Sequence, residues 1–118
     1  MSKIKTSFVA LLLFTLFSVP TVFASDRADL GWQKLEQGAL LIDVRTKQEF
    51  EQGHLDKALL HPVQEIETWS KSLDKTTPIV LYCRSGNRSG IAYQWLKENG
   101  FTNLHNAGGY EEMLQAAH

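Results

Sequence analysis

Residues 79–89 read IVLYCRSGNRS, and this stretch decides what kind of fold and site the sequence encodes. Its first four residues are apolar, a pattern typical of a short strand that is buried on both faces of a sheet. Cys83 follows at once, and a small polar loop containing Gly86 leads to Ser89, where a helical pattern begins. A strand that ends in a thiol, followed by a tight loop and a helix N-terminus, predicts an anion site with a nucleophile at its centre.

Outward from this stretch, apolar runs and helical patterns alternate along the chain, so we predict an α/β domain with a mainly parallel sheet. Ligands of such sheets bind at the carboxyl ends of the strands, which is where Cys83 is expected to lie. Gly108 and Gly109 are expected to form a tight turn before the last helix. The predicted strands are residues 39–44, 58–60, 79–82 and 101–105. The predicted helices are residues 29–37, 47–52, 64–73, a helix from 89 that ends before Asn99, and a last helix from 110. Thr46 and Glu49 have the spacing of a capping box, which would open the helix at 47–52.

The first 24 residues have the layout of a secretory signal peptide. Lys3 and Lys5 form a short basic region, and residues 8–19 are an apolar run without charge. Pro20 breaks this run, and the VFA sequence at 22–24 has small residues at the positions that a signal peptidase reads. We predict cleavage after Ala24, which leaves one domain over residues 25–118. An uncleaved membrane anchor is the alternative, but an apolar stretch of 17 residues that contains a proline is short for a membrane span.

Charge and cysteine content narrow the possible functions. The leader holds two of the 12 basic residues and none of the 13 acidic ones, so the net charge of the cleaved chain is −3. Its basic residues are scattered, which argues against a nucleic-acid partner. Cys83 is the single cysteine, and an unpaired cysteine in an exported chain suggests a reactive thiol or an intermolecular partner. The alternative is a buried cysteine that packs as a small hydrophobe.

The loop after Cys83 is suited to stabilising a thiolate. Gly86 permits the backbone angles of a tight curl, which points several backbone N–H groups inward toward an anion. These groups, the helix dipole and two guanidinium groups favour thiolate over thiol, so we predict a lowered pKa for Cys83. The same loop would stabilise negative charge on whatever becomes attached to the sulfur. The predicted site consists of Cys83 as the catalytic nucleophile and of Arg84, Ser85, Gly86, Asn87 and Arg88 as the substrate-binding loop.

Spacing within the loop separates several kinds of enzyme. Cysteine-dependent phosphatases also place a loop between Cys and Arg after a strand, but that loop is one residue longer than the four residues between Cys83 and Arg88. The shorter loop makes a smaller cradle, which favours a single sulfur atom over a phosphoryl group. No histidine lies in the loop, so nothing in the spacing supports a Cys/His hydrolase. One cysteine and dispersed histidines show none of the usual metal-ligand spacings, and we expect neither a metal nor another cofactor.

Three motifs follow one another in the chain: DVR at 43–45 with EF at 49–50 and GHL at 53–55, CRSGNRS at 83–89, and NAGGY at 106–110. Together they make residues 40–109 resemble a single-domain rhodanese, a sulfurtransferase that carries sulfur as a cysteine persulfide. With its leader and small size, the chain is similar to the exported phage-shock protein E type of this family. Three ordered motifs are a more specific signal than any one of them alone.

The resemblance implies a fold, a reaction and a location. The fold would be rhodanese-like, with helices on both faces of the sheet, and the protein would be periplasmic. Apart from the resemblance, we expect a monomer that contacts no membrane once the leader is cleaved. The Cys83 thiolate would attack a sulfane donor such as thiosulfate, release sulfite, and pass the outer sulfur to cyanide or a thiol. Two alternatives stay open: a non-catalytic sulfur carrier or binding module, and a phosphatase-like or arsenate-reducing enzyme.

The charged residues of the motifs have more than one possible role. The resemblance implies that Arg84 and Arg88 attract the anionic donor, although Arg88 could instead tie the loop to an acid such as Asp43. Arg45 and Glu49 have the helical spacing of an ion pair. Asp43 could also orient the cysteine loop from below, as an architectural rather than a catalytic residue.

The sequence departs from the rhodanese pattern after the first motif. Lys57 stands before Ala58, where relatives usually have glycine, and residues 60–61 replace a more usual polar–apolar pair before Pro62. We expect these changes to affect the local turn and the substrate preference set by that rim, and to leave the chemistry at Cys83 intact.

Overall fold

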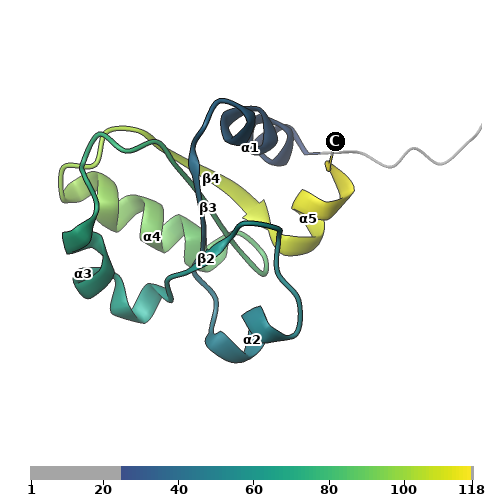
Figure 1. Cartoon of the computed structure of the whole chain (residues 1–118), viewed down its shortest axis with the longest axis horizontal. Helices are drawn as coiled ribbons and strands as arrows, with labels where there is room; N and C mark the ends of the chain where they lie inside the picture. The colour runs from purple at the N-terminus through teal and green to yellow at the C-terminus, as the bar shows by residue number, and fades with distance from the viewer. Residues whose placement is uncertain (1–24, 118) are drawn as a thin grey trace, which may run out of the picture.

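The computed structural model describes residues 25–117, and its centre is a sheet of four parallel strands. The strands are β1 (Leu40–Asp43), β2 (Leu59–Leu60), β3 (Ile79–Cys83) and β4 (Leu104–Gly109). Their order across the sheet is β2-β1-β3-β4, so β3 has a neighbour on each side (Figure 1). The predicted signal peptide and its cleavage site after Ala24 lie outside the described residues.

The cysteine strand β3 is buried along its whole length. Leu81 and Cys83 point into one apolar cluster, whereas Val80 and Tyr82 point into a second cluster on the other face of the sheet. Successive side chains of a strand point to opposite faces, so a strand covered on both faces needs an apolar residue at every position. This requirement explains the unbroken apolar run of the sequence.

Helices cover both faces of the sheet (Figure 1). The cluster around Tyr82 includes residues of α1 (Asp26–Glu36) and α5 (Tyr110–Gln115), and the cluster around Cys83 includes residues of α3 (Ile66–Trp69) and α4 (Asn87–Glu98). The short helix α2 (Lys47–Glu51) follows β1. Within residues 25–117, no helix is long and apolar enough to cross a membrane. The predicted α/β fold, with helices on both faces of a parallel sheet, is confirmed.

Two helices near the site begin at well-formed caps. The Ser25 hydroxyl accepts a hydrogen bond from the backbone N–H of Ala28 at 3.2 Å, and α1 therefore begins three residues before its predicted start. Thr46 and Glu49 form the predicted capping box of α2: the Glu49 N–H donates to Thr46 Oγ1 at 3.2 Å, and the Thr46 N–H donates to Glu49 Oε1 at 3.0 Å. The capping box fixes the position of the Glu49 carboxylate.

The prediction of a tight turn at Gly108 and Gly109 is wrong. Both residues belong to β4, in which Gly108 pairs with Tyr82 and Gly109 pairs with Cys83. The register shifts by one residue just before this point, and Gly108 has a left-handed φ of +100°, as is typical of a β-bulge. A Cβ on Gly109 would collide with the carbonyl oxygen of Arg84. The glycines therefore bring the end of β4 against the cysteine loop instead of reversing the chain.

Other boundaries differ from the predicted ones for local reasons. The segment predicted as one helix over residues 64–73 is divided into a 3-10 turn (Val63–Glu65), α3 and a second 3-10 turn (Ser70–Ser72). Its two buried anchors, Ile66 and Trp69, are three residues apart, a spacing that a 3-10 turn satisfies as well as an α-helix does. The strand predicted from residue 101 begins only at Leu104, and α4 begins at Asn87 rather than at Ser89.

Candidate active site

Cys83 is the last residue of β3, at the carboxyl edge of the sheet, and its exposed fraction is 0%. The chain turns from β3 into α4 over three residues, Arg84 to Gly86. Gly86 occupies the N-cap of α4 with a left-handed φ of +99°. This conformation is unfavourable for residues with a Cβ, which explains the glycine at the tightest point of the loop. The structure confirms the predicted order of strand, thiol, tight loop and helix N-terminus.

Hydrogen-bond donors surround the sulfur of Cys83. The backbone N–H of Gly86 donates to Sγ at 3.1 Å, and the Ser89 hydroxyl donates to it at 3.4 Å. Burial alone would raise the pKa of Cys83, but the hydrogen bonds from the Ser89 hydroxyl and from the backbone N–H groups of Ser89, Ser85 and Gly86 together outweigh it, so the pKa is lowered. The loop therefore favours the thiolate, as its sequence predicts.

Ser89 is the last residue of the CRSGNRS motif and contacts the sulfur, although the predicted site includes only Cys83 and residues 84–88. Its hydroxyl lies 2.8 Å from Asn106 Oδ1, which also accepts from the backbone N–H of Gly108 at 3.1 Å. The Asn106 amide nitrogen donates to the carbonyl oxygen of Gly86 at 3.1 Å. Asn106 thus ties the cysteine loop to β4. The signal available in the sequence was a small hydroxyl residue in the first turn of the helix that follows the cysteine loop.

We expect Ser89→Ala to raise the pKa of Cys83, because the variant removes a hydroxyl donor to Sγ while Asn106 Oδ1 keeps its bond from Gly108. The pH titration of thiolate ultraviolet absorbance measures this change, and its midpoint should move to higher pH. Ser85→Ala is the matched control, since the Ser85 hydroxyl bonds to the Asn87 N–H rather than to the sulfur. An unchanged midpoint in Ser89→Ala would mean that the backbone N–H groups alone set the thiol pKa.

The two arginines of the loop both contact Glu49. Arg88 forms a bidentate salt bridge with Glu49, with distances of 2.7 Å from Nη1 to Oε1 and 2.9 Å from Nη2 to Oε2. Arg84 makes a single contact of 3.2 Å, and its side chain is 69% exposed. The hydrogen bond from Arg88 holds the pKa of Glu49 far below its usual range. Arg88 therefore ties the loop to α2 through Glu49, which confirms the predicted alternative of a tie to an acid, although the acid is Glu49 and not Asp43.

Asp43 and Arg45 form a buried ion pair, with Arg45 Nη2 2.7 Å from Asp43 Oδ2. The prediction of a pair between Arg45 and Glu49 is therefore wrong, because Arg45 turns back to the end of its own strand. The Tyr82 hydroxyl donates to Asp43 Oδ2 at 2.6 Å and accepts from the backbone N–H of Leu55 at 3.0 Å. Burial raises the pKa of Tyr82, which keeps this hydroxyl a donor. Among the described contacts Asp43 has none with the cysteine loop, so it does not orient that loop directly.

Arg27, in the first turn of α1, reaches the cysteine loop from outside the three motifs. Its Nη2 donates to the carbonyl oxygen of Ser85 at 3.1 Å. Arg27 also forms a bidentate salt bridge with Glu112 of α5, with distances of 2.7 Å from Nε to Oε2 and 2.8 Å from Nη2 to Oε1. Hydrogen bonding to Glu112 is the main cause of the raised pKa of Arg27, and the Cys83 thiolate contributes to it. The sequence contains no signal for this contact, because Arg27 and Ser85 are 58 residues apart.

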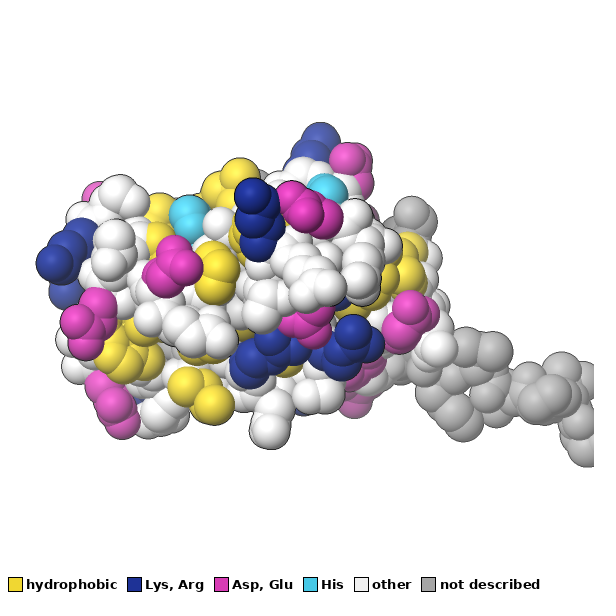
Figure 2. Space-filling model, turned by 90° about the horizontal axis from the view of Figure 1, so that it is seen from below, with side chains coloured by type: hydrophobic (Ala, Val, Ile, Leu, Met, Phe, Trp, Pro, Cys, Tyr) yellow, Lys and Arg dark blue, Asp and Glu magenta, His cyan; other side chains and the backbone are white. Residues whose placement is uncertain are grey.

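A cavity of about 160 Å³ opens beside the loop. It is lined by Arg84 together with Arg45, Glu49 and Tyr110, and by Gln52, Gly53 and Glu111. Figure 2 shows lysine and arginine side chains directly beside acidic ones on the face of the molecule that is seen from below. The cysteine loop is therefore bordered by charges of both signs.

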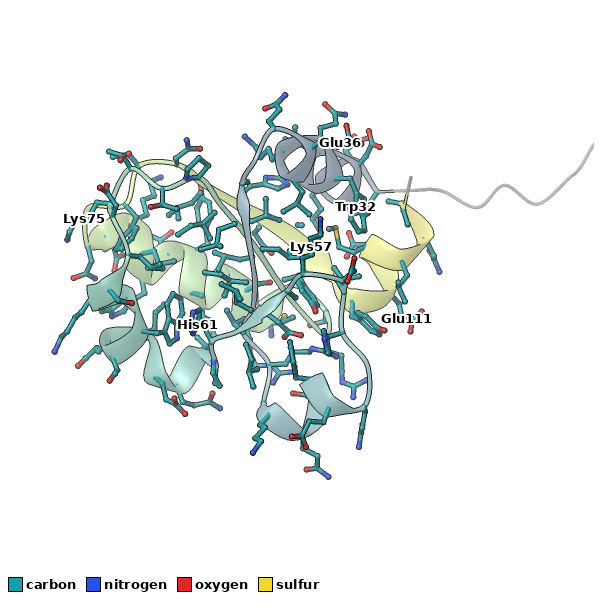
Figure 3. The ribbon with its side chains drawn as sticks, viewed as in Figure 1. Trp32, Glu36, Lys57, His61, Lys75 and Glu111 are labelled. Carbon is teal, nitrogen blue, oxygen red and sulfur yellow. The ribbon has the colours of Figure 1, made fainter. Side chains whose placement is uncertain are left out.

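The departures from the rhodanese pattern lie along the β2 edge of the sheet, where Figure 3 labels Lys57 and His61. Lys57 has a φ of +68°, a left-handed conformation that costs a residue other than glycine roughly 1 kcal/mol. The ring of His61 stacks on Trp69, with ring centroids 5.0 Å apart. The turn before β2 thus keeps a left-handed geometry suited to glycine although a lysine occupies it.

Comparisons with known proteins agree with this geometry. Residues 27–116 match the family described as the rhodanese-like domain. The chain is 32% identical to thiosulfate sulfurtransferase PspE of Escherichia coli (strain K12) over 105 residues, which are 87% of this chain and 88% of that protein. It is 39% identical to the uncharacterized protein YqhL of Bacillus subtilis (strain 168) over 75 residues, or 63% of this chain and 60% of YqhL. A solved structure described as a rhodanese with anions from E. coli has a TM-score of 0.59 at 32% identity, covering 64% of this chain and 91% of that one.

The family match spans the described domain from α1 to α5, including the cysteine loop and the last strand. The relatives include a protein named as a sulfurtransferase, of which this chain covers most of the length. The four-stranded parallel sheet with helices on both faces agrees with the likeness to the solved rhodanese. The chain therefore belongs to the rhodanese-like family.

Proposed function

We propose that the protein is a sulfurtransferase that moves a sulfane sulfur from thiosulfate, or a similar donor, to a thiophilic acceptor through a persulfide on Cys83. The observation that carries this proposal is the convergence of hydrogen-bond donors on Cys83 Sγ, with the N–H of Gly86 at 3.1 Å and the hydroxyl of Ser89 at 3.4 Å. A thiolate in such a site is a strong nucleophile, and the same donors can stabilise an anion one sulfur atom further out.

The proposed reaction has two displacement steps. In the first, the Cys83 thiolate attacks the outer sulfur of thiosulfate, a new S–S bond forms as the S–S bond of thiosulfate breaks, and sulfite leaves with the electron pair. In the second step, cyanide or a thiolate attacks the outer sulfur of the persulfide, and the S–S bond to Cys83 breaks. The product is thiocyanate or a new persulfide, and the Cys83 thiolate is regenerated. Charge and electrons balance in each step, so the scheme needs no cofactor and no external oxidant.

The loop residues divide between holding the sulfur and receiving the donor. We assign the backbone N–H groups of Ser85, Gly86 and Ser89 to the persulfide, because they bond to Sγ, whereas the Asn87 N–H bonds to the Ser85 hydroxyl. The exposed guanidinium of Arg84 can meet an anionic donor, since its single contact with Glu49 is 3.2 Å long. Arg88 is engaged by Glu49 through two shorter bonds, so we assign it to holding the loop in place.

Mass spectrometry of the purified protein tests the proposal. Incubation with thiosulfate should add one sulfur atom at Cys83, and subsequent cyanide should remove it and produce thiocyanate. Sulfur that loads but does not transfer would indicate a carrier rather than an enzyme. If no sulfur loads, the proposed function is wrong.

We also propose that residues 1–24 are a signal peptide, cleaved after Ala24, and that the domain of residues 25–118 works in the periplasm. The proposal rests on the basic, apolar and small-residue regions of the leader. It is compatible with Ser25 as the N-cap of α1, the first helix of the described residues. The intact mass of the same sample, isolated from a periplasmic fraction, reports the cleavage site. An intact mass that includes the leader would contradict it.

A further inference from the structure

The guanidinium of Arg27 lies against the cysteine loop in a space that only glycines leave open. A Cβ on Gly86 would stand 2.7 Å from Arg27 Nη2, and a Cβ on Gly108 would stand 2.6 Å from Arg27 Nε. Both distances are too short for real side chains. One glycine belongs to the loop and the other to β4, so α1 delivers a positive charge to the point where the loop and β4 meet.

Not all of this guanidinium is used by the protein. Nε and Nη2 bond to Glu112, and Nη2 also bonds to Ser85, whereas Nη1 has no hydrogen-bond partner among residues 25–117. The Arg27 side chain is 44% exposed, so a solute can reach it. Nη1 presents two N–H donors beside the loop, and a guanidinium with free donors is suited to sulfonate or phosphate oxygens.

We propose that Arg27 binds the anionic oxygens of the sulfur donor at this site, and that Glu112 weakens this binding. This inference rests on the proposed sulfurtransferase function and names a residue outside the cysteine loop for it. The carboxylate of Glu112 neutralises part of the charge of Arg27, so the affinity for a dianion is set by the balance of the two side chains.

Two neutralising variants separate this role from a structural one, because they change the charge at the site in opposite directions. Arg27→Gln should lower kcat/KM for thiosulfate about tenfold, the loss of one partly exposed charge-assisted hydrogen bond. Glu112→Gln should raise it about threefold, because the glutamine keeps an acceptor for the N–H of Gly109 while the negative charge is lost. Methanethiosulfonate, with one negative charge instead of two, should respond less to both variants.

Lys34→Gln is the matched control for net charge. Lys34 lies two helical turns further along α1, about 10 Å away by the rise of a helix. It lines a cavity with Pro78 and Ile79, at the opposite end of β3 from Cys83. Kinetics with thiosulfate should be unchanged in this variant. If Arg27 only braces the loop, Arg27→Gln and Glu112→Gln break the same ion pair and should both lower kcat and thermal stability, which would overturn the proposal.

A second measurement is independent of sulfur transfer. The ratio of Cys83 alkylation rates by iodoacetate, which is anionic, and iodoacetamide, which is neutral, measures the charge felt by an approaching anion. The ratio should fall about threefold in Arg27→Gln and rise in Glu112→Gln, relative to the wild type and Lys34→Gln. If the wild type transfers no sulfur but the ratios shift as expected, the proposed function fails and the anion site stands. Equal ratios in all four proteins would refute the anion site.

Discussion

Cys83→Ser should abolish sulfur transfer from thiosulfate, with a loss of at least about a thousandfold in turnover, because a hydroxyl at this position is neither ionised nor able to carry sulfane sulfur. The loss is measured as thiocyanate formed from thiosulfate and cyanide. Serine is nearly the size of cysteine and can accept the hydrogen bond from the N–H of Gly86 that Sγ accepts in the wild type. The defect should therefore be chemical rather than structural.

Cooperative thermal unfolding of Cys83→Ser, at a midpoint close to that of the wild type, is the control for folding. Cys83 is buried in the apolar cluster of α3 and α4, so a hydroxyl there costs some stability but does not open a cavity. Transfer that persists in Cys83→Ser would refute the persulfide mechanism and all the roles assigned to the loop. A variant that loses transfer only because it unfolds would show a lost or broadened transition.

Asp43→Ala should cost about 3–5 kcal/mol of unfolding free energy, the largest effect on stability that we expect from one substitution in this chain. The Arg45 side chain is 5% exposed and Asp43 is 0% exposed, so the variant leaves a guanidinium buried without its carboxylate. It also removes the acceptor of the Tyr82 hydroxyl. The total free energy of unfolding of a domain of this size is about 5–15 kcal/mol. Asp43→Ala should therefore unfold at a much lower urea concentration than the wild type.

Tyr82→Phe is the matched comparison for Asp43→Ala. It removes the hydroxyl that bridges Asp43 and the N–H of Leu55 but keeps the ion pair, and its cost should be about 1–3 kcal/mol. The double variant Asp43→Ala with Arg45→Met removes both charges and should recover part of the loss. If Asp43→Ala is no less stable than Tyr82→Phe, the buried pair contributes little and the loop after β1 is held by other contacts.

Local patterns were sufficient to predict the centre of the molecule. The run from Ile79 to Tyr82 identified β3, because a strand covered on both faces has no polar position, and the strand ends in the thiol of Cys83. The capping box of Thr46 with Glu49 was predictable because both partners lie within four residues of sequence. Such signals depend only on neighbours along the chain.

The charged partners of the site could not be predicted, because they come from segments that are distant in sequence. Arg88 and Glu49 are 39 residues apart, and Arg27 and Glu112 are 85 apart. The chain has 12 basic and 13 acidic residues, and spacing alone cannot choose among their many pairings. The same reason explains the error at Gly108 and Gly109. Glycines favour turns locally, but here pairing with β3 decides their conformation.

The Ser89 hydroxyl has a consequence for how the site changes during a reaction cycle. It stands 3.4 Å from Cys83 Sγ and 2.8 Å from Asn106 Oδ1, and a hydroxyl has one proton to give to two acceptors. A charged Sγ competes for that proton, whereas a sulfur whose charge has moved to an outer atom releases it to Asn106. Rotation of the Ser89 hydroxyl about its Cβ–Oγ bond then moves the hydrogen bond from one acceptor to the other as the charge on Sγ changes. The backbone of the loop need not move.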